Sequence, residues 1–149
     1  MRLASLLALA LAFAATPALA QPRIGGTPGE TLAIADAPVS AALQAGGGDR
    51  NAVPGSGCSG YIDNARPSAT LTVSGDGPLS IYAVSGSDTT LLVSDPAGRW
   101  HCSDDANGSN PAVTFARAAP GAYVVWVGTF SPNEGARATL SAVRGQPAW

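Results

Sequence analysis

The chain of 149 residues carries 8 basic and 10 acidic side chains, a formal net charge of −2, and it contains no lysine. The length suits a single domain. Because the arginines are scattered singly and the overall balance is mildly acidic, the composition argues against nucleic acid and anionic membrane surfaces as partners, since both attract clustered positive charge.

The first twenty residues have the pattern of a secretory signal peptide. Arg2 supplies a positive charge, residues 3–15 form an almost unbroken apolar run, and the segment TPALA ends at Ala20 with small residues. We expect cleavage after Ala20 and a mature protein in the periplasm or outside the cell. The apolar run is shorter than the about 20 residues that a membrane span needs, so no membrane insertion is predicted.

Residues 21–57 are rich in Gly, Ala and Pro, with GGG at 46–48 and PGSG at 54–57. Two short apolar pieces, Thr31 to Ala35 and Val39 to Leu43, interrupt this composition. The pattern predicts an N-terminal arm or linker with weak strands that precedes the main domain.

The pattern changes at Cys58, and the main domain is expected over residues 58–145, followed by a tail at 146–149. Short β-rich runs alternate here with turns of Gly, Pro, Asp and Asn, which is typical of an all-β sandwich or barrel. No helical period is sustained outside the first twenty residues. The β-rich runs are 69–73, 79–84, 89–94, 99–102, 112–115, 122–130 and 136–143.

Cys58 and Cys102 are the two cysteines of the chain. An even count in an exported protein predicts a disulfide between them. Closing a loop of about 45 residues would stabilise the fold by roughly 4 kcal/mol in the chain-entropy model. The alternative, a nucleophilic Cys58 paired with His101, is disfavoured because a free thiol is hard to keep reduced after export.

The stretch WHCSDDANGSNP at 100–111 gathers the only histidine, one cysteine and two adjacent aspartates. Because neighbouring side chains on a strand point to opposite faces, Trp100 and Cys102 share one face and His101 the other. If the disulfide face is buried, His101 is expected on the solvent side. The chain also lacks a Gly-x-Ser-x-Gly elbow, so we expect no catalytic residues and no enzyme.

Calcium is the cofactor that this stretch best fits. Asp104, Asp105 and Asn107 place two carboxylates and an amide oxygen on one turn, and hard cations prefer such ligands. Three weaker candidate ligands are Asp88, Asp95 and Asn110. The alternative is that Asp and Asn make the turns through hydrogen bonds to their own backbone. No other cofactor is indicated.

Several turn and strand motifs follow one another in a distinctive order, namely Leu91 to Val93, Asp95 to Gly98, Asp104 to Asn107, Val113 to Phe115, Ala119 to Tyr123 and Val125 to Gly128. With these motifs, residues 58–143 resemble the bacterial pre-peptidase C-terminal domain, and the part from Cys58 onward is similar to its cysteine-containing subtype. The resemblance implies a jelly-roll-like β-sandwich that trails secreted proteases, is itself non-catalytic, binds substrates or surfaces, and in some members binds calcium.

These observations favour an exported, non-catalytic β-sandwich module that binds a protein, a glycan or an envelope component. A small secreted hydrolase or peptidase accessory protein, with His101 as its base, is the alternative. Among the aromatic residues, Tyr123 and Trp126 lie on opposite faces of one strand, so at most one is expected to be exposed. Trp149, at the end of the chain, is expected either to dangle or to dock.

Overall fold

The computed structural model describes residues 21–51, 53 and 57–149, so the expected signal peptide lies outside the described part. The described residues form eleven β-strands and no α-helix. The strands are β1 Glu30–Ile34, β2 Val39–Ala45, β3 Asp49–Arg50, β4 Tyr61–Ile62, β5 Ala69–Val73, β6 Gly77–Ser85, β7 Thr89–Ser94, β8 Trp100–Ser103, β9 Ala112–Ala118, β10 Gly121–Thr129 and β11 Ala136–Val143. No helix in the described residues is long and apolar enough to cross a membrane.

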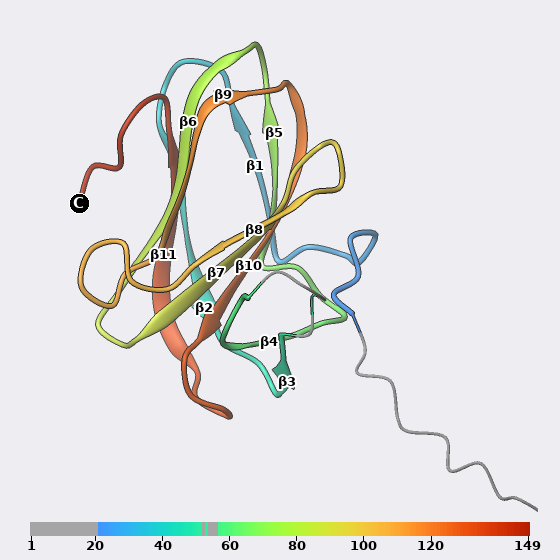
Figure 1. Cartoon of the computed structure of the whole chain (residues 1–149), viewed down its shortest axis with the longest axis vertical. Coiled ribbons are helices and arrows are strands. Elements are labelled where there is room, and N and C mark those ends of the chain that lie inside the picture. Colours follow the sequence, from blue (N-terminus) through green and yellow to red (C-terminus); the bar gives the residue numbers. More distant parts are fainter. Residues whose placement is uncertain (1–20, 52, 54–56) are drawn as a thin grey trace, which may run out of the picture.

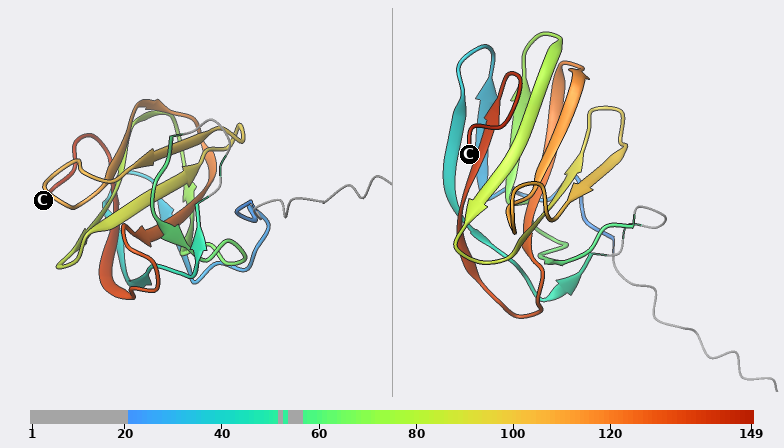
Figure 2. Two further views of the ribbon diagram at one scale, coloured as in Figure 1. Left: turned by 60° about the horizontal axis from the view of Figure 1, so that its bottom comes forward. Right: turned by 60° about the vertical axis from the view of Figure 1, so that its left-hand side comes forward.

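The strands form two layers, which Figures 1 and 2 show from three directions. One sheet has seven strands with the path β1-β5-β10-β4-β3, and β7 pairs with both β10 and β8. The other has four strands in the order β2-β11-β6-β9. The expected all-β sandwich is therefore confirmed.

The main core lies between the sheets because each strand turns alternate apolar residues inward. It includes Leu71 of β5, Leu79 of β6, Val93 of β7 and Leu140 of β11, each at most 2 % exposed. A second, smaller cluster joins Ile62, Leu92, Val124 and Trp126. Since Leu92 alternates with Leu91 and Val93 of the main core, this cluster covers the outer face of the seven-stranded sheet.

The two apolar pieces before residue 58 are strands of the sandwich itself. β1 runs parallel to β5 over all five of its residues, and β2 pairs antiparallel with β11 from Val39 to Ala45. The sheets therefore begin with β1, upstream of the boundary at residue 58 that the composition suggested. The reason is that both pairings join residues far apart in the sequence, which local composition does not report.

Candidate functional site

The disulfide expected from the sequence is present between Cys58 and Cys102, and it leaves no free cysteine. It ties the segment before β4 to β8, across a sequence separation of 44 residues. Both cysteines pack against the second cluster, where Trp100 also lies with its ring 5.7 Å from that of Trp126. The disulfide is thus part of an apolar cover on the outside of the seven-stranded sheet.

His101 points to the opposite face from Trp100 and Cys102, as the strand period predicted. The expectation that it faces solvent is met only in part, because this face of β8 also turns toward β9 of the four-stranded sheet. The imidazole ring lies 4.8 Å from that of Phe115 on β9, edge to face, and Nε2 is 3.0 Å from Oδ2 of Asp95. Its side chain is 31 % exposed.

Asp95 is the polar centre of the β7–β8 turn. Its Oδ1 accepts hydrogen bonds from the backbone N–H groups of Ala97 and Arg99, and its Oδ2 accepts one from Nε of Arg99 at 2.8 Å. Burial of the side chain tends to raise the pKa of Asp95, but the hydrogen bonds from His101 and Arg99 outweigh it and lower the pKa to about 2. The carboxylate is therefore ionised at neutral pH and organises the turn.

A hydrolytic triad needs a nucleophile on the free side of the histidine. Within the described part of the chain, no serine, threonine or cysteine side chain hydrogen-bonds to His101. The carboxylate of Asp95 and the imidazole of His101 are therefore paired as in a triad, but no nucleophile among the described residues is hydrogen-bonded to this imidazole.

The candidate calcium ligands Asp104, Asp105 and Asn107 lie in one loop but have different surroundings. Oδ2 of Asp104 accepts a hydrogen bond from Ser59 Oγ, whereas Asp105 is exposed. Asn107 forms a backbone bridge with Asn110. In the described residues, no three His, Cys, Asp or Glu side chains come close enough together to hold a metal ion.

The weaker candidates have partners of their own. Asn110 Oδ1 accepts a hydrogen bond from the Ser85 N–H, Asp95 serves the β7–β8 turn, and the exposed Asp88 uses its backbone carbonyl to accept from Phe130 N–H. Calcium binding at Asp104, Asp105 and Asn107 stays a prediction. Thermal unfolding in millimolar calcium and in chelator tests it, since a ligand of the folded state must raise the melting temperature.

The three aromatic residues considered as binding contacts differ in how exposed they are. Tyr123 and Trp126 are both 1 % exposed, so neither of the two is available to a partner. Trp149 docks: its ring lies 5.2 Å from that of Tyr82 on β6, in a T-shaped arrangement, and the residue is 50 % exposed. No sequence pattern pointed to Tyr82 as its partner, because the contact joins residues 67 positions apart.

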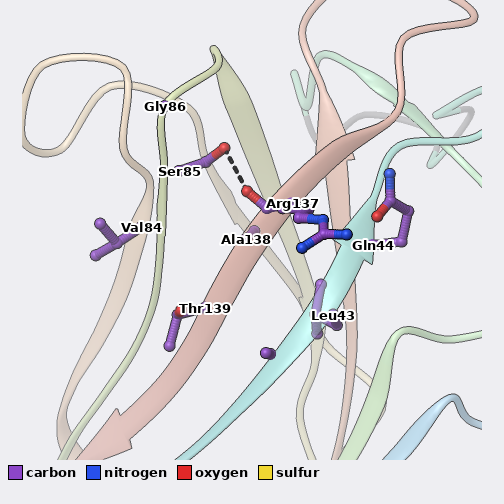
Figure 3. A pocket seen from close by; sticks show the side chains of 9 residues that line it. Leu43, Gln44, Val84, Ser85, Gly86, Arg137, Ala138 and Thr139 are labelled. Atoms are coloured by element: carbon purple, nitrogen blue, oxygen red, sulfur yellow. Dashed lines mark hydrogen bonds between the residues drawn. The ribbon is translucent and has the colours of Figure 1, made fainter.

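The outer face of the four-stranded sheet carries a shallow groove of about 590 Å³, which we call the outer groove. Figure 3 shows it as a strip along β2, β11 and β6. Val84, Thr139 and Arg137 are exposed there, and Ser85 Oγ donates a hydrogen bond to the carbonyl of Arg137. The lining residues are Ala42, Leu43, Gln44, Val84, Ser85, Gly86, Arg137, Ala138 and Thr139.

Arg137 is the only charged residue in that lining. The surrounding side chains are uncharged and include small, apolar and polar ones, such as Ala42, Val84 and Gln44. Arg137 forms no ion pair with any described residue. Sequence reasoning did not find this surface, because residues from three strands build it and only their register brings them together.

The fold and these surfaces define a disulfide-bonded, two-sheet β-sandwich with an exposed groove on its smaller sheet. No family model matches the chain, and no curated protein matches it. Among solved structures, it is similar to the pre-peptidase C-terminal domain of a collagenase from Bacillus anthracis, with 17 % identity, 80 % of this chain and 98 % of that one covered, and a TM-score of 0.48.

It is also similar to PliG of Aeromonas hydrophila, a periplasmic inhibitor of g-type lysozyme. The identity is 16 %, the match covers 81 % of this chain and 100 % of that one, and the TM-score is 0.46. Neither similarity is close enough to carry a functional argument, and membership of the pre-peptidase C-terminal family stays a prediction from the motifs.

Proposed function

We propose that the protein is an exported, non-catalytic β-sandwich module that binds a protein, a glycan or an envelope component through the outer groove. The observation that carries the proposal is the groove itself. It combines an arginine without an ion-pair partner in the described chain with hydroxyl, amide and methyl groups on a rigid sheet. Such a concave surface, with a few placed polar groups, is suited to recognition.

Export is supported by the disulfide and by the signal-like sequence at 1–20. Disulfides persist in oxidising compartments and are rare where thiols are kept reduced. The bond between Cys58 and Cys102 leaves the chain without a free thiol. Both features fit a protein that folds after it has left the cytoplasm.

The binding proposal is tested with the immobilised mature chain and an envelope extract divided into protein and glycan fractions. Thr139→Arg places a long charged side chain in the outer groove. Thr72→Arg is the matched control, because Thr72 is an exposed threonine of β5 in the other sheet. We expect one fraction to be retained by the unaltered chain and by the control, and to be lost with Thr139→Arg. Equal retention by both variants, or retention by none, contradicts the proposal.

A second candidate is a small secreted hydrolase or peptidase accessory protein. The observation in its favour is the hydrogen bond of 3.0 Å between His101 and Asp95, since a carboxylate positions the base in hydrolytic triads. Assays with peptide and ester substrates distinguish the two candidates. We expect no turnover, and an activity that disappears in His101→Ala would replace the module proposal.

A further inference from the structure

The C-terminal residues of the chain lie on the same sheet face as the outer groove. After β11 ends at Val143, the chain reverses and runs back over β6, and Figures 1 and 2 show its end beside β6 and β11. Ser80 Oγ donates a hydrogen bond to the carbonyl of Gly145, and Tyr82 OH donates one to the carbonyl of Ala148. Trp149 contacts the ring of Tyr82. From here on, the tail means residues 145–149, one residue more than the tail expected from the sequence.

The contacts of the tail show how this face holds a peptide segment, which bends at residues 144–146 and then follows β6. Side-chain hydroxyl groups of β6 donate to backbone carbonyls, and an aromatic ring receives an aromatic side chain. None of these interactions uses the side chains of Gln146 and Pro147, which lie between the anchor points. The face is therefore chemically suited to peptide backbone.

The outer groove continues the path of the tail. The tail contacts Ser80 first and Tyr82 second, so it runs in the direction of β6, and Val84 and Gly86 follow next along the strand. Arg137 lies four residues along β11 from Ser141, which is the register partner of Tyr82. At about 3.3 Å per residue, the guanidinium-bearing position is about 13 Å beyond Tyr82.

The groups along this second stretch can bind backbone and one negative charge. Thr139 carries a hydroxyl, Gln44 carries an amide, and Val84 is 41 % exposed as an apolar contact. Arg137 stands at the far end without an acidic partner among the described residues. A guanidinium binds carboxylates in a two-pronged geometry, which favours an acidic group at that position.

We propose that the outer groove binds an extended peptide segment of a partner protein, which continues the path of the tail and places an acidic residue at Arg137. This inference rests on the proposed function and names the class of partner. A partner peptide with its own aromatic residue competes with Trp149 for Tyr82, so the tail regulates access to the first half of the path.

The experiment uses the full mature chain and a synthetic octapeptide, acetylated and amidated, with the sequence GQPAWSSE. It repeats the tail and adds three residues, which brings its single carboxylate four residues beyond the position equivalent to Ala148. The protein carries Trp149→Ala, which removes the ring contact of its own tail with Tyr82, so that the peptide competes only with the backbone contacts of Gly145 and Ala148. Affinity is measured by titration, and the contact surface by amide chemical shifts in NMR spectra.

We expect the peptide to shift the amide signals of Val84, Thr139 and Arg137. We also expect binding to weaken roughly threefold when the peptide glutamate is replaced by glutamine or when the protein carries Arg137→Gln, as for one exposed ion pair. Arg117→Gln is the matched control, because Arg117 is exposed on β9 and lies outside the groove. The chain with its native Trp149 should bind the peptide more weakly.

Three results would overturn the inference. Peptide shifts away from the groove, or no binding at all, exclude a peptide path on this face. Equal affinities for Arg137→Gln and Arg117→Gln exclude the acidic contact. If the chain retains a glycan fraction, loses it with Thr139→Arg and does not bind the peptide, the partner is not a peptide but the proposed function stands. If Thr139→Arg does not change the retention, the proposed function itself is rejected.

Discussion

At the scale of single residues, Asp95 combines a turn-forming role with hydrogen bonds to two side chains. Its carboxylate is only 2 % exposed, yet it receives hydrogen bonds from two backbone amides, from Arg99 and from His101. The motif Asp-Pro-Ala-Gly predicted the turn. It did not predict the hydrogen bond between Asp95 and His101, because that contact depends on how β8 pairs with β7.

The lowered pKa of Asp95 makes a prediction about acid stability. A carboxyl whose pKa falls from 3.8 to about 2 on folding stabilises the folded state at higher pH by about 2 kcal/mol. This contribution is present above pH 3.8 and is lost as the pH falls through about 2. We expect Asp95→Asn to lower the free energy of unfolding at pH 7, and the difference from the unaltered chain to shrink toward pH 2.

Urea unfolding at a series of pH values measures this difference. Asp105→Asn serves as the control, because Asp105 is exposed and makes no hydrogen bond or ion pair within the described residues. A difference for Asp95→Asn that stays constant from pH 7 to pH 2 would show that the hydrogen bonds, and not the charge, carry the effect.

Gly121 provides a second test at this scale. A Cβ at Gly121 would lie 2.9 Å from Cβ and Cγ of Pro96, so the β9–β10 turn packs directly on the β7–β8 turn. Its φ of +136° is one that residues with side chains rarely adopt. Gly77 is a matched control, since its φ is +138° and no atom lies within 4 Å of its Cβ position.

We expect both Gly77→Ala and Gly121→Ala to lower the free energy of unfolding through backbone strain. Gly121→Ala should cost about 1–2 kcal/mol more, because the added methyl group overlaps Pro96. Denaturant unfolding of the two variants gives the comparison, and equal losses would mean that Pro96 moves aside without cost.

At the scale of elements, short β-rich runs separated by turn residues were the most informative signal. The expected runs 69–73, 89–94 and 136–143 coincide with β5, β7 and β11. The two-residue strands β3 and β4 were missed because two residues carry no period. The groove could not be predicted either, since its residues become neighbours only through the register of β2, β11 and β6.

The direction of the faces of β8 was predicted, but their surroundings were not. The period separates His101 from Trp100 and Cys102, and the structure does the same. The sequence gives no information on which face meets the other sheet. That depends on the order of strands, which places β8 at the edge beside β9.

The disulfide should contribute strongly to stability, because it joins elements that are far apart in sequence. We expect Cys58→Ala/Cys102→Ala to lower the free energy of unfolding by up to roughly 4 kcal/mol. Denaturant unfolding with and without reductant measures the effect. Reductant should destabilise the unaltered chain to the same level and leave the double variant unchanged, and an unaltered chain that resists saturating reductant without loss would contradict the expected contribution.

At the scale of the whole molecule, Arg144 connects three segments at one end of the sandwich. Its Nε donates to the carbonyl of Ala35, after β1, and its Nη2 donates to the carbonyls of Ser74 and Gly75 in the β5–β6 turn. Since Arg144 itself follows β11, one guanidinium holds together segments of both sheets.

We expect Arg144→Met to lower the free energy of unfolding by about 2 kcal/mol, because charge-assisted hydrogen bonds are lost while the aliphatic stem is kept. Arg117→Met is the control, since Arg117 is exposed on β9 and makes no hydrogen bond or ion pair in the described chain. Chemical unfolding of both variants measures the change. Equal losses in the free energy of unfolding would show that the hydrogen bonds of Arg144 do not stabilise the fold.

The pairing of β2 with β11 also has a consequence for how the protein is made. These strands are neighbours in space, yet their paired residues, from Ala45 with Ala136 to Val39 with Ala142, lie far apart in the sequence. Such topology gives a high contact order, which slows folding because a long chain must close before its distant contacts form. The smaller sheet therefore cannot be completed until β11 has been synthesised, so the chain stays open while β2 waits for this partner.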